Sequence, residues 1–316
     1  MDSKTKQAAI AAVDFSCNAL PISFIILAIR SNANTPIDEN NPEDAMSLLA
    51  YYNREQYGDW PILYGKSFNA PYDRNDPFSD GKPVYQRGYA VMKGPKRVTA
   101  FKLRNEAEAY VAEKGGNLTI DGQYLMTDDK KASKPNYDPK YQGFFPRIWN
   151  DDPQYKQNYL KIVGITDEKK PITFAQNVKF FFEYQVGKMY WRYFMWNFSG
   201  RQNDAQHRYE MSKGNWITGI GFIDAMRIGN QENLPDHMKN DPSRNTYFML
   251  PFLLGIFGLW YQYKKNNKDA WAVTLFFLLT GLAIVVYTNH KPFEPRERDY
   301  AFVGSFYAFA IWIGIG

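Results

Sequence analysis

Two apolar segments close to the C-terminus constrain this chain most strongly. Residues 247–263 and 271–287 each hold 17 residues, mostly Leu, Phe, Ile, Val and Gly, and both are edged by Trp or Tyr. A helix of about 20 apolar residues crosses the hydrocarbon of a bilayer, and Trp and Tyr are enriched at the two membrane surfaces. Only the seven residues 264–270 separate the segments. The pattern predicts two transmembrane helices joined as a tight hairpin.

Two further segments extend the predicted membrane part. Residues 8–29 are long enough to span a bilayer, and a bundle tolerates their Asp14, Asn18 and Pro21 where these face other helices. Residues 301–316 are predicted as the start of a truncated transmembrane helix. If 8–29, 247–263 and 271–287 each cross once, residues 31–245 and 288–300 face the same aqueous side. Lys and Arg are found near both predicted sides, so their distribution does not reveal which side is the cytoplasm.

Residues 31–245 are polar and are predicted to form one mixed α/β domain. Helical spacing of apolar residues predicts helices over 43–57 and 173–196. Residues 83–103 alternate and break at Gly94-Pro95, which predicts a hairpin, and 119–126 fits a further strand. The net charge of +5 is spread along the chain, which argues against a nucleic-acid partner. The single cysteine, Cys17, excludes an internal disulfide.

The loop 288–300 carries six charged side chains between two apolar segments. Charges at a membrane surface must pair or stay in water, because an ion in hydrocarbon is costly. Guanidinium groups match phosphate oxygens, so Arg296 and Arg298 are predicted to bind a donor phosphate. The acids Glu294, Glu297 and Asp299 are predicted to support these arginines. The alternative is an ion-pair cluster that merely closes the turn and includes Lys291.

An acidic pair follows the first predicted span. Asp38 and Glu39 lie within residues 37–44, a segment rich in carboxylates. Such a pair could hold a divalent cation or act as a general base. The alternative is a solvated turn leading into the helix predicted over 43–57, where acids favour the helix dipole.

Five residues are candidates for substrate binding. Arg54, Asp59 and Trp60 surround a tight turn and could grip a sugar or phosphate, although Trp60 could equally anchor an interfacial helix. Arg147 and Arg192 each stand in an aromatic cluster, which either stacks on a sugar or packs in a core. The sequence contains no P-loop, dinucleotide-binding glycine motif or nucleophile elbow, and its three histidines lack metal-ligand spacing.

Four runs carry a family resemblance: IDENNPED, REQYGDWP, FFPRIW and KPFEPRERDYAFVGSFYAFAIWIGIG. At these positions the chain resembles the DUF2723 membrane proteins of Bacteroidetes. Those proteins are placed with GT-C glycosyltransferases and with the vertebrate O-mannosyltransferase of IPT domains. The chain looks like an internal fragment of such a protein, and the resemblance implies a membrane α-helical fold, a GT-C-like multi-pass bundle with a mixed α/β extracytoplasmic domain.

The resemblance also implies an activity and a location. It points to a transferase of the bacterial inner membrane that moves a mannose-like sugar from a polyprenyl-phosphate donor to a hydroxyl of an acceptor protein. Residues 31–245 and 288–300 would then be periplasmic. The catalytic acid of that class usually lies upstream of the residues seen here, so Asp38 and Glu39 are only substitutes for it. The alternative function is a membrane-anchored module that binds a glycan or a protein without catalysis.

Overall fold

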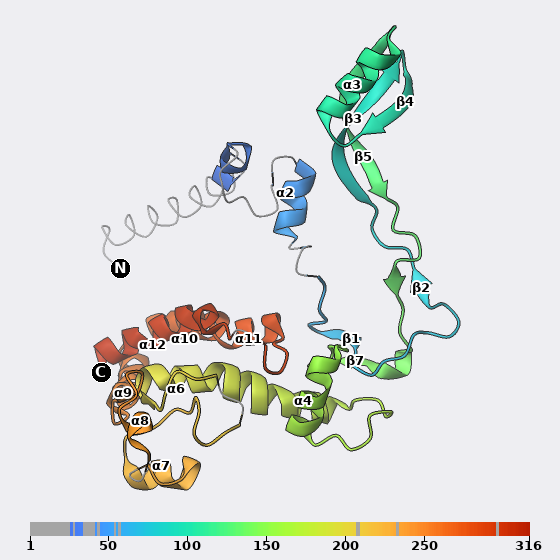
Figure 1. Ribbon diagram of the computed structural model, residues 1–316. Helices are drawn as coiled ribbons and strands as arrows, with labels where there is room; N and C mark the ends of the chain where they lie inside the picture. The colour runs from blue at the N-terminus through green and yellow to red at the C-terminus, as the bar shows by residue number, and fades with distance from the viewer. Residues whose placement is uncertain are drawn as a thin grey trace, which may run out of the picture. The chain divides into compact units, whose positions relative to one another are not determined.

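The computed structural model describes residues 26, 27, 29–33, 42, 45–53, 55, 58–206, 209–231, 234–294 and 297–316 (Figure 1). The chain divides into two units. Unit 1 comprises residues 1–59 and 75–136, and unit 2 comprises residues 60–74 and 137–316. Residues of the predicted 31–245 domain therefore occur in both units.

Unit 1 is built on a three-stranded antiparallel sheet with the strand order β4-β3-β5. The predicted hairpin is confirmed, because β3 and β4 pair on either side of Gly94, which has a φ of +61°. The predicted strand over 119–126 is also confirmed, as part of β5. In chain order the described elements are α2 (Ala45–Tyr52), β2 (Phe78–Ser79), β3 (Val84–Lys93), β4 (Lys96–Phe101), α3 (Arg104–Lys114), β5 (Leu118–Asp128) and β6 (Lys134–Pro135).

The core of unit 1 is small. Within its described residues the buried apolar side chains are Ala90 and Val91 of β3 and Ala107 of α3. Phe101 and Tyr110 pack with their ring centroids 5.4 Å apart. Helix α3 and the sheet therefore share a thin apolar layer made largely of small side chains.

Unit 2 is mainly helical with short strands. The predicted long helix is confirmed over Phe174–Phe198, and its middle part is a π-helix. The elements are β1 (Tyr64–Lys66), η2 (Pro139–Tyr141), β7 (Gln142–Phe144), α4 (Pro153–Val163), α5 (Phe174–Phe180), the π-helix η3 (Phe181–Trp191), α6 (Arg192–Phe198), β8 (Gly200–Arg201), α7 (Gly221–Ile228), α8 (Asp236–Lys239), β9 (Asn245–Thr246), α9 (Leu250–Lys265), α10 (Asn267–Thr280), α11 (Leu282–Thr288), η4 (Asp299–Phe302) and α12 (Val303–Ile315).

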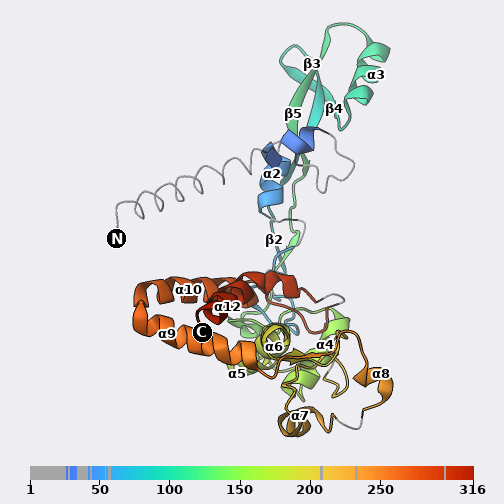
Figure 2. The same ribbon diagram turned by 90° about the vertical axis from the view of Figure 1, so that its left-hand side faces the viewer.

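The C-terminal helices pack through aromatic side chains. Phe309 and Trp312 of α12 are buried in a cluster with Phe194 and Phe198 of α6. Gly258 lets α9 approach α12 closely, because an added Cβ would lie 1.8 Å from the Trp312 carbonyl oxygen. The predicted hairpin between α9 and α10 is confirmed, since Asn266 alone separates them. Figure 2 shows α9 and α10 running side by side.

The predicted multi-pass bundle was wrong, and the described structure is mixed α/β. Among the described residues one helical stretch, Asn267–Thr288, is long and apolar enough to cross a membrane. Helix α9 begins only at Leu250, because Phe248 and Met249 have positive φ, and its 16 residues end in two lysines. That length gives about 24 Å against a hydrocarbon thickness of about 30 Å. The predicted span 8–29 lies almost wholly outside the described residues.

Candidate functional site

A cavity of about 580 Å³ lies in unit 2 between helix α4 and two loops. Gln154, Asn158 and Lys161 stand at helical spacing, so they present one polar side of α4 to it. Tyr209 and Phe293 form the aromatic wall on the loop side. The cavity is within the size range of small-molecule sites, which is about 300–1,000 Å³.

Local sequence explains how α4 presents its polar side. The Asp152 carboxylate caps the helix by accepting from the Gln154 N–H at 3.0 Å, and Pro153 occupies the first turn. Gly164 ends the helix in the left-handed conformation. The opposite side of α4 is apolar and packs into a core with Phe68 and Phe180. Burial of that side leaves the polar side directed toward the cavity.

The aromatic wall is held from behind by the π-helix. Phe293 has a φ of +55°, and its N–H donates to the Tyr184 hydroxyl at 2.7 Å. Its ring makes edge contacts with Tyr184 and Tyr209, at centroid distances of 5.7 and 5.9 Å. Burial raises the pKa of Tyr184 and of Tyr209, so both phenols stay neutral at physiological pH. π-Helical turns are rare and are often found at functional sites.

Lys188 supplies a positive charge beside this wall. Its Nζ lies 4.7 Å from the centroid of the Tyr209 ring. Burial, together with the charges of Arg192 and Arg227, lowers the pKa of Lys188 to about 8. No carboxylate in the described part of the chain forms an ion pair with Lys188, whereas Arg192 is paired with Glu297 at 2.7 Å.

Residues 289–294 are tied to the rest of unit 2 by side-chain amides. Gln185 donates to the Asn289 side-chain oxygen and to the His290 carbonyl, both at 2.9 Å. Asn289 donates in turn to the carbonyls of Pro61 and Pro146 at 2.8 and 2.9 Å. These bonds explain how a loop can place Phe293 at a defined position in the cavity wall.

In the predicted charged loop 288–300, some charged side chains are paired and others are exposed. Arg296 lies outside the described residues, and Arg298 and Asp299 are exposed. Glu297 accepts from Arg192 and from the Tyr193 hydroxyl, so it supports the long helix. Burial of Glu294 would raise its pKa. His290, the Lys291 N–H and the charge of Arg298 oppose this effect and hold the pKa below its usual value.

Of the other predicted site residues, the described Asp59 and Trp60 do not line the cavity. Asp38, Glu39 and Arg54 lie outside the described residues, and Asp59 is exposed in unit 1. Trp60 donates to the Tyr287 carbonyl at 2.7 Å, at the end of α11. We therefore assign Trp60 a structural role.

Arg147 and Arg192, which were predicted to bind substrate, donate their hydrogen bonds to groups inside the protein. Arg147 is fully buried and donates to the carbonyls of Val286, at 2.8 Å, and of Ile62. Arg192 is 2% exposed and donates to the Lys188 carbonyl as well as to Glu297. Carbonyls in the last turn of a helix lack partners within the helix, and Arg147 satisfies one of them in α11. These contacts stabilise unit 2 and leave few donors for a ligand.

The acidic pair Asp38 and Glu39, which was predicted to hold a divalent cation, lies outside the described residues. Within the described ranges, no three His, Cys, Asp or Glu side chains lie together as metal ligands.

Sequence reasoning missed every residue that lines the cavity. The Asp152-Pro153 start and the Gly164 end are ordinary helix signals and could have predicted α4 with its polar side. Tyr209, Phe293 and Lys188 come from three separate parts of the chain. No local pattern indicates that they meet.

Comparison with known proteins identifies one family of unknown function, DUF8416, whose model matches residues 96–182. The match covers less than a third of the chain and includes residues of both units. The resemblance to DUF2723 predicted from the four sequence runs was wrong, because the matching model is that of a different family. No curated protein and no solved structure matches the chain.

Proposed function

We propose that unit 2 binds a saccharide in the cavity between α4 and the Tyr209–Phe293 wall. The observation that carries this proposal is that the cavity has a polar side and an aromatic side. Amide groups of Gln154 and Asn158 face one side, and aromatic rings form the other. Sugars present hydroxyl groups at their edges and C–H groups on their faces, and amphipathic aromatic surfaces suit such ligands. Polar groups that fix orientation in a largely apolar pocket are the usual design of small-molecule sites.

The amides of α4 are partly preorganised for this role. Asn158 donates to the Gln154 carbonyl at 3.1 Å, which restrains its side chain and leaves its oxygen available as an acceptor. Lys161 adds a further donor one turn along the helix. Donors and acceptors held on a helix are positioned more precisely than those on a mobile loop.

The proposed saccharide site belongs to a protein that contacts a lipid bilayer. The support for this contact is the stretch Asn267–Thr288, which is apolar and mostly not buried by the rest of the described structure. Its 22 residues extend about 33 Å, which is enough to cross the hydrocarbon. A lipid surface would cover the exposed Leu275, Phe276 and Leu279 of α10.

Glycosyl transfer stays a prediction that no cavity residue supports. The reaction needs a general base beside the acceptor hydroxyl, and an effective base has a pKa near the working pH. Among the described residues that line the cavity there is no acid, and the pKa of Glu294, next to Phe293, is held low. Incubation of the protein with a polyprenyl-phosphate sugar and an acceptor protein would test it, and sugar transfer to the acceptor would establish the activity.

The binding proposal is tested with the full chain in nanodiscs. A glycan array selects a saccharide, and titration calorimetry measures its affinity. We expect Gln154→Ala and Tyr209→Ala each to weaken binding about tenfold, equal to about 1.4 kcal/mol. Gln157→Ala is the matched control, because Gln157 is exposed on the same helix but does not line the cavity. Equal affinities for Gln154→Ala, Gln157→Ala and the unaltered protein would place the saccharide elsewhere.

A further inference from the structure

Helix α7 exposes two large apolar side chains, whereas its inner side buries the charged Asp224 together with Ile228. Phe222 and Met226 are 70% and 77% exposed, whereas Asp224 is 3% exposed. The two large apolar residues stand four apart, so they share one outward side of the helix. Surface helices of soluble proteins normally turn the apolar side inward and the charged side to water.

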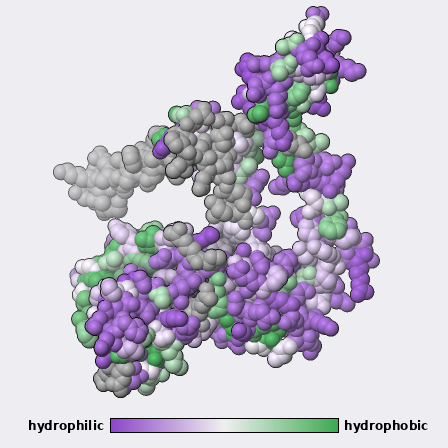
Figure 3. Space-filling view, in the orientation of Figure 1, coloured by the Kyte–Doolittle hydropathy of each residue, from purple (hydrophilic) through white to green (hydrophobic). Residues whose placement is uncertain are grey.

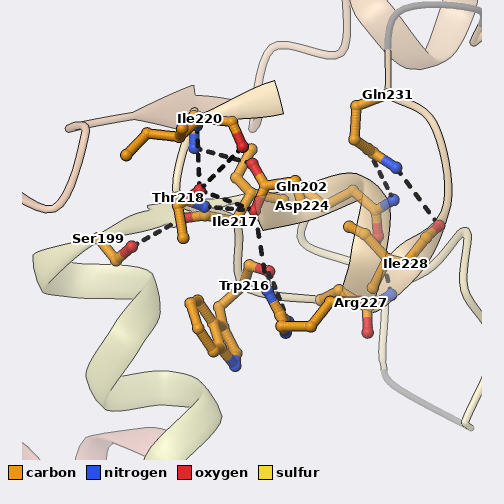
Figure 4. A network of polar contacts seen from close by, with 12 residues as sticks. Ser199, Gln202, Trp216, Ile217, Thr218, Ile220, Asp224, Arg227, Ile228 and Gln231 are labelled. Atoms are coloured by element: carbon orange, nitrogen blue, oxygen red, sulfur yellow. Dashed lines mark hydrogen bonds and ion pairs between the residues drawn. The ribbon is translucent and has the colours of Figure 1, made fainter. Parts of the chain in front are cut away.

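Hydrogen bonds hold α7 in this orientation (Figure 4). The Asp224 carboxylate accepts from the N–H groups of Thr218 and Gly219, at 2.8 and 2.9 Å, and from the Thr218 hydroxyl at 3.0 Å. Arg227 stacks 3.5 Å from the Trp216 ring centroid and donates to the Trp216 carbonyl at 3.0 Å. Turning the helix to bury Phe222 would leave these buried polar groups without partners, which is costly.

The loop that leads into α7 packs against the exposed apolar start of α9. Gly219, two residues before α7, packs against Phe248, whose ring atoms would be 3.1 Å from an added Cβ. Phe248 is 55% exposed and Leu250, the first residue of α9, is 60% exposed. Figures 1 and 2 together show α7 lying across the direction in which α9 runs. Exposed apolar residues therefore occur on α7 and at the start of α9, and Figure 3 shows green patches mixed with purple at the lower left of the molecule.

The distribution of residue types on the C-terminal helices favours lipid over protein as the partner. The turn between α9 and α10 collects lysines beside two exposed tryptophans: Lys264, Lys265, Lys268, Trp260 and Trp271. Lys264 lies 4.4 Å from the Trp260 ring. Tryptophan next to lysine at the end of an apolar helix is typical of a membrane surface. Helices that lie in the interface insert their apolar side about 5–10 Å into it.

We propose that α7 is an in-plane anchor that inserts Phe222 and Met226 into the surface of a lipid bilayer. This inference rests on the proposed bilayer contact of the C-terminal helices. It adds a second point of contact, so that unit 2 meets the membrane with α7 as well as with α9 and α10. The anchor would limit rotation of unit 2 relative to the membrane surface.

The test measures how deep single positions lie in the bilayer. The full chain, with Cys17→Ser to remove the native thiol, is labelled with an environment-sensitive fluorophore at one new cysteine and placed in phosphatidylcholine nanodiscs. Lipids with nitroxides at the headgroup or deep in the acyl chain then quench the label. Met226→Cys reports α7, Leu279→Cys reports α10, and Asp167→Cys, at an exposed loop position after α4, is the control.

We expect the label at position 226 to be quenched at least twofold more by shallow than by deep nitroxides, and the label at 279 to be quenched by deep ones. The label at 167 should be quenched by neither. Quenching at 279 without quenching at 226 would overturn the proposal that α7 is an anchor. The same result would still support the bilayer contact of the C-terminal helices. A label at 226 that is shielded from water yet unquenched by lipid would show a protein partner, which also overturns the proposal. No quenching at either position would contradict the bilayer contact itself.

Discussion

The two units bury very different interiors. Unit 1 encloses three small apolar side chains within its described residues, whereas unit 2 encloses three aromatic-rich clusters and a buried ion pair. Burial of apolar surface contributes about 25 cal/mol per Å², so large aromatic side chains stabilise a fold far more than alanine does. Because packed aromatic clusters hold neighbouring side chains in place, we expect side chains to be positioned more precisely in unit 2, where the cavity lies.

The same contrast appears in the ion pairs. Arg192 and Glu297 are 2% and 11% exposed at the side chain, whereas Arg104 and Glu108 in unit 1 are 71% and 55% exposed. A buried pair leaves a costly unpaired charge when one partner is removed, and an exposed pair does not.

The largest expected effect comes from breaking the buried pair. Glu297→Gln should lower the free energy of unfolding of unit 2 by about 3–5 kcal/mol, because Arg192 stays buried and charged without its partner. All eight tryptophans belong to unit 2, so tryptophan fluorescence during denaturation reports this unit. Glu108→Gln is the control in unit 1, where hydrogen exchange of the β3–β5 amides measures stability, and it should change the free energy of unfolding of that unit by less than about 1 kcal/mol. Equal effects of the two substitutions would remove the distinction between the units.

A glycine substitution should have the next largest effect. Gly258→Ala places a Cβ 1.8 Å from the Trp312 carbonyl oxygen, and backbone atoms cannot move aside as a side chain can. Overpacking of this kind costs about 1–3 kcal/mol. Gly314→Ala in α12 is the matched control, because no atom lies within 4 Å of its added Cβ. Thermal unfolding followed by tryptophan fluorescence should separate the two variants, and a stable Gly258→Ala protein would refute the close approach of α9 and α12.

The smallest expected effect concerns Lys188 and depends on pH. Its folded-state pKa of about 8 lies below the usual 10.5, so the unfolded chain binds more protons between these values. Stability should therefore rise as pH increases from about 8 toward 10.5. Lys188→Met should remove this rise and raise the free energy of unfolding by about 1–2 kcal/mol at pH 7.

Denaturant titrations at pH 7 and 9.5 measure the difference between the two proteins. Both values lie below the usual tyrosine pKa of about 10, so the buried tyrosines contribute little to the change. A gain for Lys188→Met that is the same at both pH values would contradict the titration of Lys188.

Local patterns predicted much of the secondary structure. Alternation around Gly94 identified β3 and β4, and helical spacing identified the long helix that ends at Phe198. Apolar length alone overestimated the membrane part, because positive φ at Phe248 and Met249 delays the start of α9. Length also gave no sign that Phe309 and Trp312 are buried against other helices.

The candidate site was much harder to predict than the fold. Arg147 and Arg192 look like ligand-binding residues in sequence because each stands among aromatics, yet both are buried and donate to carbonyls or to Glu297. Whether an arginine faces a ligand or a helix end depends on tertiary contacts between residues more than 100 positions apart, such as Arg192 and Glu297. Single-sequence patterns carry no information about such contacts.

The central claim is that a saccharide lies against the Tyr209–Phe293 wall of the cavity. Saturation-transfer NMR tests it directly, with the full chain in nanodiscs and the saccharide selected by the array. Saturation of the protein aromatic protons should reach the C–H protons on one face of the sugar ring. Tyr209→Ala should abolish most of that transfer. Equal saturation of all sugar protons, unchanged in Tyr209→Ala, would contradict the claim.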